Sequence, residues 1–144
     1  MATEPPQGMD RINPYLYYED VTAALAWLKS AFGLEERIRI REPDGAVTHA
    51  EMTYEGGVVM LGCPGKEFSN PARTGSRHGA LYIYVPDVDA HFEHARARGA
   101  KVIHEPETMF YGDRRYAVED LEGHHWFFAT HVRDVPIEEL PGAG

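Results

Sequence analysis

The chain has 144 residues, 43% of them hydrophobic, and its 14 lysines and arginines stand against 23 aspartates and glutamates, for a formal charge of −9. This length suits one hydrophobic core, and the negative charge disfavours nucleic acid, whose phosphates require a basic surface. The sequence has no apolar run long enough to span a membrane and no signal-peptide pattern. We therefore expect a cytoplasmic protein without nucleic-acid or membrane partners, and the single cysteine, Cys63, agrees with a reducing compartment.

The first half of the chain predicts a strand, a helix and three further strands. Aromatic or alternating apolar residues predict strands in four segments, 15–18, 37–41, 46–54 and 58–61. After the first of these, apolar residues recur at three- and four-residue spacing, which predicts an amphipathic helix. Asp20 is placed to cap this helix and Gly33 to end it.

The second half predicts the same order. Its predicted strands are 80–85, 101–104, 114–119 and 126–130. The predicted helix, 88–98, begins after Asp87 and ends at Gly99. Sliding the sequence until Tyr15 falls on Tyr82 aligns the halves at a constant offset, with further identities that include Tyr17/Tyr84, Asp20/Asp87, Ala50/Ala117 and Gly56/Gly123. This offset predicts an internal repeat.

A segment rich in glycine, proline, serine and asparagine separates the two halves. We expect a single domain over residues 1–144, with module one at about 12–62, a linker at 63–78, module two at about 79–131 and a surface tail at 132–144. The chain is too short for each half to be an ordinary domain with its own function.

Three features together resemble the vicinal oxygen chelate superfamily, which includes glyoxalase I, bleomycin-resistance proteins and extradiol dioxygenases. They are the Asp-Val pair at each helix start, the run 111–115 (Tyr-Gly-Asp-Arg-Arg) before a strand, and the turn 120–124 (Asp-Leu-Glu-Gly-His) before the last strand. The resemblance covers about residues 11–131. It implies an α+β fold of two tandem βαβββ modules whose sheets curl around a shared cleft, often completed by a homodimer.

The resemblance also implies where a divalent metal ion would be bound. In the metal-dependent members, histidine, glutamate or glutamine ligands lie on the first and last strand of each module, and the ion acts as a Lewis acid. The corresponding positions here are Asn13 and Ala80, seven residues before the capping aspartates, and Met60 and Phe127, four residues after the turn glycines. These residues offer no set of metal donors, so we expect no metal cofactor.

A displaced metal site is the alternative. His78 and His125 each stand two residues before a mapped position, and Glu51 shares a strand face with His49. These side chains could supply imidazole and carboxylate ligands to a divalent metal ion. The simpler interpretation is favoured: His78 is expected in a loop and His125 at an exposed turn, where histidines are usually solvated.

Strand alternation predicts an aromatic lining around the mapped positions. The expected ligand-binding residues are Asn13, Tyr15, Tyr17, Met60, Tyr82, Tyr84, Phe127 and Arg114. Arg114 and its neighbour Arg115 are expected at the mouth of the cleft. Such a lining suits a flat, apolar or cationic molecule, although aromatic residues at strand spacing are also typical of a core.

Two functions therefore remain open. The first is a metal-free small-molecule-binding protein of the bleomycin-resistance type, which holds a hydrophobic, aromatic or cationic compound and for which the sequence assigns no catalytic residues. The second is a metal-dependent, glyoxalase-like lyase or isomerase, or a dioxygenase, with ligands at His78, Glu51 and His125.

Overall fold

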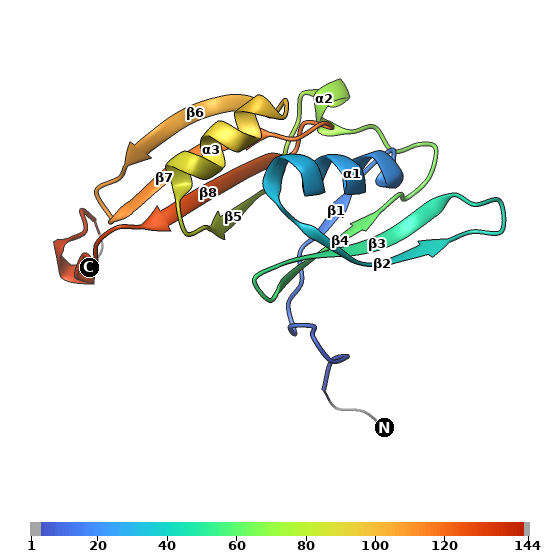
Figure 1. Cartoon of the computed structure of the whole chain (residues 1–144), viewed down its shortest axis with the longest axis horizontal. Helices are drawn as coiled ribbons and strands as arrows, with labels where there is room; N and C mark the ends of the chain where they lie inside the picture. Colours follow the sequence, from blue (N-terminus) through green and yellow to red (C-terminus); the bar gives the residue numbers. More distant parts are fainter. Residues whose placement is uncertain (1–3, 143–144) are drawn as a thin grey trace. The chain divides into compact units, whose positions relative to one another are not determined.

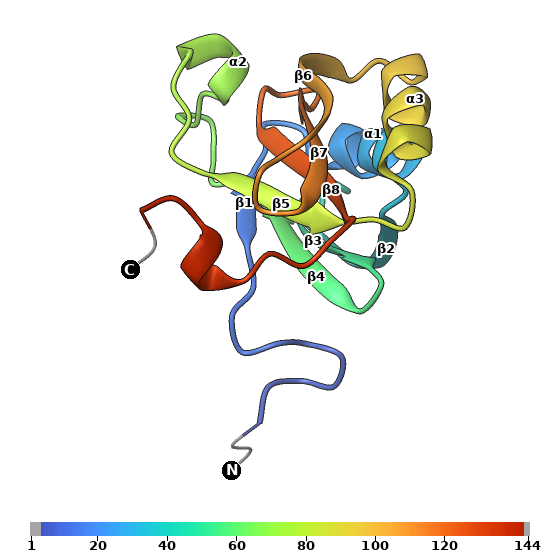
Figure 2. The ribbon, with the colours of Figure 1, turned by 90° about the vertical axis from the view of Figure 1, so that its left-hand side faces the viewer.

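A computed structural model describes residues 4–142 of the chain. It is an α+β protein whose described residues form two compact units, divided between Ser76 and Arg77. Each unit contains a four-stranded mixed sheet with a long helix against one of its faces (Figures 1 and 2). No helix within residues 4–142 is long and apolar enough to cross a membrane.

Unit 1 has the predicted order of elements. They are β1 (Tyr15–Tyr17), α1 (Val21–Phe32), β2 (Glu35–Arg41), β3 (Val47–Tyr54), β4 (Gly57–Gly62) and the short helix α2 (Pro71–Thr74). The sheet order is β1-β4-β3-β2, in which β1 lies parallel to β4 and the other pairs are antiparallel. Strand, helix and three strands therefore form one βαβββ module.

Unit 2 repeats this topology. Its elements are β5 (Ala80–Tyr84), α3 (Val88–Ala97), β6 (Lys101–Thr108), β7 (Asp113–Glu119), β8 (His125–His131) and a 3₁₀ turn (Ile137–Glu139). The sheet order is β5-β8-β7-β6, again with a single parallel pair, β5 with β8. The predicted α+β class with two βαβββ modules is confirmed, and the cleft shared between the modules stays a prediction.

Both long helices begin where the sequence predicts. Asp20 accepts a hydrogen bond from the backbone N–H of Ala23 at 2.9 Å, and Asp87 accepts one from that of Ala90 at 3.1 Å. Helix α1 ends at Gly33, which has a positive φ of 80° that favours glycine. Equivalent caps therefore start the equivalent helices of the two modules.

Two elements differ from the prediction. Strand β6 continues beyond the predicted end at His104 to Thr108. Pro106 does not end the strand, because it lies in the interruption of the ladder between His104 and Glu107, where it need not donate a hydrogen bond. The linker contains α2, which Asn70 caps by accepting from the N–H of Arg73 at 3.0 Å. Glu19 also binds Arg73, at 2.9 Å, which fixes this segment to the rest of unit 1.

Each sheet buries alternate residues beneath its helix. The fully buried residues on the covered face include Ala50, Met52 and Leu61 in unit 1 and Tyr116, Val118, Trp126 and Phe128 in unit 2. Directly paired residues of neighbouring strands share a face, so the alternation fixes the opposite side of each sheet as well. We call that opposite side the helix-free face of the unit.

The repeat is offset differently on one strand. In the sequence alignment Met60 corresponds to Phe127 and Glu51 to Val118, yet Met60 pairs with Glu51 whereas Phe127 pairs with Ala117, the residue before Val118. Ala50 therefore lies on the helix-covered face, whereas Ala117, its partner in the sequence repeat, lies on the helix-free face. A shift of one residue exchanges the two faces of a strand.

The turns before the last strands account for the different pairing. In unit 1, Tyr54 pairs with Gly57 across a two-residue turn, whereas in unit 2 Glu119 pairs with His125 across residues 120–124. Asp120 organises this longer turn, because its buried carboxylate accepts from two backbone N–H groups of the turn and from the Trp126 indole, each at 3.0 Å.

Candidate functional site

The helix-free face of unit 1 brings together several predicted residues. Tyr15 pairs with Met60 between β1 and β4, and Met60 pairs with Glu51 on β3, so the three side chains share this face. Tyr17 lies on the same face as Tyr15. The two tyrosines are 46% and 50% exposed, which leaves ring surface available for contact with a ligand.

Asn13 lies just before β1. Its side-chain nitrogen donates to the carbonyl of Asp10 at 2.6 Å, whereas its side-chain oxygen is buried and has no hydrogen-bond partner among the described residues. An unpaired buried acceptor is costly, and because this oxygen is shielded from solvent, a ligand would reach it only after a movement of the Asn13 side chain.

A hydrogen-bonded chain crosses the face of unit 1. The Tyr15 hydroxyl lies 2.8 Å from Nδ1 of His49, Nε2 of His49 lies 3.2 Å from Glu51, and Glu51 also pairs with Arg37. A neutral imidazole that donates from Nε2 to the carboxylate accepts from Tyr15 at Nδ1. Burial, with Tyr17 and Glu51 nearby, raises the pKa of Tyr15, which keeps its hydroxyl protonated and able to donate.

Gly62 makes room for this chain. A Cβ atom at Gly62 would lie 2.6 Å from the Tyr15 hydroxyl and 2.7 Å from its ring. The tyrosine therefore reaches His49 only because the residue beneath its ring has no side chain. Ala129, the equivalent of Gly62 in the repeat, already carries a Cβ at the corresponding position of β8.

The aromatic residues of unit 2 are held differently. Tyr82 pairs with Phe127 between β5 and β8, and their rings stack at 5.9 Å with an interplanar angle of 22°. The hydroxyls of Tyr82 and Tyr84 both donate to one oxygen of Asp113, at 2.7 and 2.9 Å, and His131 lies 2.8 Å from the other oxygen. The two tyrosines are 40% and 58% exposed, while Asp113 is buried.

These contacts set the charges of the cluster. Burial, followed by the hydrogen bond to Asp113, raises the pKa of Tyr82. Burial acts to raise the pKa of Asp113 too, but the hydrogen bonds from Tyr82, His131 and Tyr84 hold it below its ordinary value. Hydrogen bonds to Asp113 and then to Asp134 raise the pKa of His131. Asp113 is therefore a buried carboxylate that fixes two neutral phenols.

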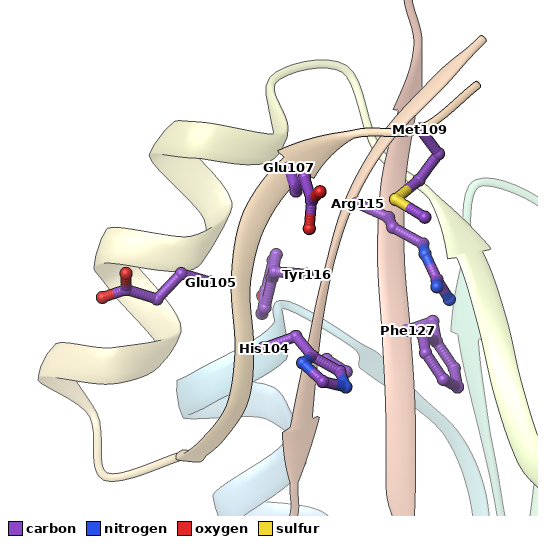
Figure 3. Close-up of a pocket in the computed structure, with 8 residues that line it drawn as sticks. His104, Glu105, Glu107, Met109, Arg115, Tyr116 and Phe127 are labelled. Carbon is purple, nitrogen blue, oxygen red and sulfur yellow. The ribbon is translucent and has the colours of Figure 1, made fainter. Parts of the chain in front are cut away.

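A cavity of about 250 Å³ opens beside this cluster. It is lined by His104, Glu105, Glu107, Met109, Arg115, Tyr116, Ala117 and Phe127 (Figure 3). The Arg115 guanidinium lies over the Phe127 ring at 4.9 Å from its centroid. The cavity thus combines ring surface with a positive charge, and it lies at the interrupted part of the β6–β7 ladder.

The two adjacent arginines of β7 point to opposite faces. Arg114, which we expected at the mouth of the cleft, forms an ion pair with Asp89 of α3 at 3.0 Å and so lies on the helix-covered side. Arg115 lines the cavity instead. Strand alternation shows that the two arginines lie on opposite faces. Which of them faces the cavity follows only from the pairing of Phe127 with Ala117, which the sequence does not reveal. Sequence reasoning also missed His104, Met109 and the role of Asp113.

The mapped metal positions do not fit a divalent ion. Met60 and Ala80 supply no carboxylate or imidazole, and Phe127 is stacked between Tyr82 and the cationic Arg115. Within residues 4–142, no group of three histidine, cysteine, aspartate or glutamate side chains could hold a metal.

Two of the three residues of the displaced metal site, Glu51 and His125, have other partners. Glu51 binds Arg37 and His49. His125 lies 3.3 Å from Glu119, which Arg77 also binds, and it begins β8 rather than lying in an exposed turn. His78 is exposed in the segment before β5.

Comparison with known proteins agrees with this fold. The family model described as Glyoxalase/Bleomycin resistance protein/Dioxygenase superfamily matches residues 8–128. The uncharacterized proteins Mb0911c of Mycobacterium bovis and Rv0887c of Mycobacterium tuberculosis are each 34% identical over 138 residues, covering 92% of this chain and 90% and 81% of theirs. The chain belongs to the glyoxalase/bleomycin resistance protein/dioxygenase superfamily, as the sequence predicts.

Solved structures support the same assignment. TioX from Micromonospora sp. ML1 is 31% identical, with a TM-score of 0.69 over 85% of this chain and 99% of TioX. A glyoxalase-related enzyme from Clostridium phytofermentans is 14% identical, with a TM-score of 0.66 over 90% of this chain and all of that one, and shows the fold alone.

Proposed function

We propose that this protein is a small-molecule-binding member of its superfamily that holds a hydrophobic, aromatic or cationic compound without a metal ion. The observation that carries the proposal is the partial exposure of four tyrosine rings on the helix-free faces, beside family metal positions that lack donors. The proposal includes three expectations from the sequence: the modules share a cleft, the protein forms a homodimer, and it is located in the cytoplasm.

The tyrosines have properties that suit recognition. Tyrosine gives a large contact area for little loss of side-chain freedom, and its ring face attracts planar and cationic groups. In unit 2, Asp113 fixes both hydroxyls, so the rings are oriented before a ligand arrives. Such preorganisation lowers the cost of binding.

The metal-dependent alternative has less support. A metal held by His78, Glu51 and His125 would require Glu51 to release Arg37 or His49, and His125 to release Glu119. Releasing Arg37 would take away the carboxylate partner of a partly buried cation, which costs free energy.

A titration with neutral naphthamide, followed by calorimetry with and without chelator, tests the proposal. We expect Tyr17→Leu and Tyr82→Leu to weaken binding by roughly two- to tenfold, as aromatic contacts of about 0.5–1.5 kcal/mol imply, and chelator to have no effect. Tyr54→Leu is the matched control, because Tyr54 lines a separate hollow near Gly33.

Two results would contradict the proposal. One is the failure of naphthalene compounds of any charge to bind. The other is stoichiometric metal in protein purified without chelator, whose removal lowers the melting temperature and whose binding is abolished by His78→Ala. The second result would favour the lyase, isomerase or dioxygenase alternative.

A further inference from the structure

Arg115 is a cation without an ionic partner. Among residues 4–142, no carboxylate lies within 4.0 Å of its guanidinium, and its contact is with the Phe127 ring. Arg114, the adjacent residue, is by contrast paired with Asp89. Arg115 is half-buried and lines the cavity of unit 2, so its charge faces a space that a small molecule can enter.

The carboxylates on the same strand face are already occupied. Asp113, two residues before Arg115, accepts from Tyr82, Tyr84 and His131. Glu119, at the far end of β7, is held by Arg77, His125 and Lys101. Each neighbour that could neutralise Arg115 along β7 is therefore engaged by other donors, and the guanidinium keeps its hydrogen-bonding capacity.

The two glutamates that line the cavity, Glu105 and Glu107, do not form an ion pair with Arg115 either. Glu107 is the cross-strand partner of Arg115 but forms no ion pair with it, and Glu105 points away from Arg115 and Phe127 (Figure 3). The bulge around Pro106 separates β6 from β7 at this point. The interrupted part of the ladder, between His104 and Glu107, borders the cavity.

The remaining lining suits a planar apolar body. Met109 and Phe127 line the cavity together with Arg115 (Figure 3), and Tyr82 continues the ring surface from Phe127. A guanidinium stacked flat on a ring still presents its N–H groups at its edge, where they can bind both oxygens of a carboxylate. His104 adds a ring nitrogen to the same cavity.

We infer that the cavity of unit 2 is a subsite for an aromatic monocarboxylate, with the carboxylate bound by Arg115 and the ring placed against Phe127 and Tyr82. This inference rests on the proposed function and narrows its ligand class. The protein's formal charge of −9 and the glutamates of the cavity oppose a polyanion. One unpaired arginine matches one negative charge on the ligand.

The test compares naphthoate, naphthamide and naphthylmethylammonium, which share one ring system and differ in charge, by calorimetry on the full chain. We expect naphthoate to bind the native protein about tenfold or more tightly than naphthamide, because a hydrogen bond to a charged group exceeds a neutral one by this much. Arg115→Gln should remove that preference, and Arg115→Lys should restore part of it.

Arg114→Gln is the matched control, since it removes the same charge from the adjacent residue on the opposite face. We expect it to change the affinity for naphthoate by less than about twofold. Circular dichroism and melting temperatures show whether each variant is folded, and the comparison of the three ligands on native protein needs no variant.

The outcomes separate this inference from the proposed function. Equal binding of naphthoate and naphthamide, weakened by Tyr82→Leu, would overturn the carboxylate subsite and leave the proposed function standing. A preference for naphthylmethylammonium, or an equal loss in Arg114→Gln and Arg115→Gln, would also overturn the subsite. No binding of any of the three would overturn both.

Discussion

The helix-free faces of the two units have the same strand topology but differ in how their charged side chains are paired. In unit 1, Tyr15, His49, Glu51 and Arg37 form a closed hydrogen-bonded chain in which each charge is compensated. In unit 2, three side chains donate to Asp113, whereas Arg115 lies beside a cavity and has no ionic partner among residues 4–142. Equivalent topology therefore does not imply equivalent chemistry, because the residues that reach each face differ.

The largest expected effects on stability come from substitutions in the cores of the two units. Phe128 of unit 2 corresponds to Leu61 of unit 1 in the repeat, and both are fully buried. Phe128 also packs against Trp126, Tyr116 and His91. We expect Phe128→Ala to cost about 3–5 kcal/mol of unfolding free energy and Leu61→Ala about 2–5 kcal/mol.

Urea unfolding can assign these losses to each unit. The chain has two tryptophans, Trp27 in α1 and Trp126 in β8, so replacing one of them with phenylalanine leaves a fluorescence signal from the other unit. We expect Phe128→Ala to lower the midpoint reported by Trp126. An unchanged midpoint would show that the core of unit 2 is not packed as described.

A smaller effect is expected where the two faces diverge. Gly62→Ala would place a methyl group against the Tyr15 ring. We expect this variant to lose about 1–3 kcal/mol of unfolding free energy and the hydrogen bond between Tyr15 and His49. Gly57→Ala on the same strand is the control, because its Cβ meets only the Tyr54 carbonyl, at 3.4 Å, and should cost less than about 0.5 kcal/mol.

Chemical denaturation and the NMR signals of His49 measure both parts of this prediction. Equal stability of Gly62→Ala and the native protein, with the His49 signals unchanged, would mean that the Tyr15 ring does not depend on the glycine beneath it.

The smallest expected effect is a pH dependence that belongs to unit 2. His131 has a raised pKa, so its contribution to stability is present below its unfolded value of 6.5 and is lost as pH rises through the higher folded value. Asp113 has a lowered pKa, so its contribution is present above 3.8 and lost as pH falls through the lower folded value. Unit 1 has Pro64 at the position equivalent to His131.

NMR titration of the His131 ring measures this coupling. Asp113→Asn should lower the pKa of His131 towards 6.5, because the hydrogen bond to Asp113 is the leading cause of its shift. Asp134→Asn should have the smaller effect, since Asp134 is almost fully exposed. A larger change in Asp134→Asn than in Asp113→Asn would reverse the assignment.

Local signals made most of the fold predictable from the sequence. Asp20 and Asp87 identify the helix starts by their own chemistry, and strand alternation correctly put Tyr15 with Met60, and Tyr82 with Phe127, on common faces. The residues at the four mapped metal positions were also enough to argue that those positions offer no set of metal donors. All of these inferences use residues close together in the sequence or the constant offset of the repeat, and both can be read without a structure.

The cavity was not predictable in the same way. Its position depends on the interrupted pairing of β6 with β7, and Arg115 rather than Arg114 faces it because Phe127 pairs with Ala117. Pairing between strands is a property of the folded sheet, which the constant offset misrepresents by one residue on β7. The long-range donors to Asp113 are likewise invisible until β5, β7 and β8 are placed side by side.

The turn at residues 120–124 has a consequence for how such repeats diverge. A substitution changes one side chain, whereas a change in the length of a turn can exchange every core-facing residue of a strand for a solvent-facing one. Such a change survives only if the new turn is itself stable, and Asp120 supplies that stability here through its three hydrogen bonds. A single well-anchored turn can thus make equivalent strands of two repeated modules present different residues on their surfaces.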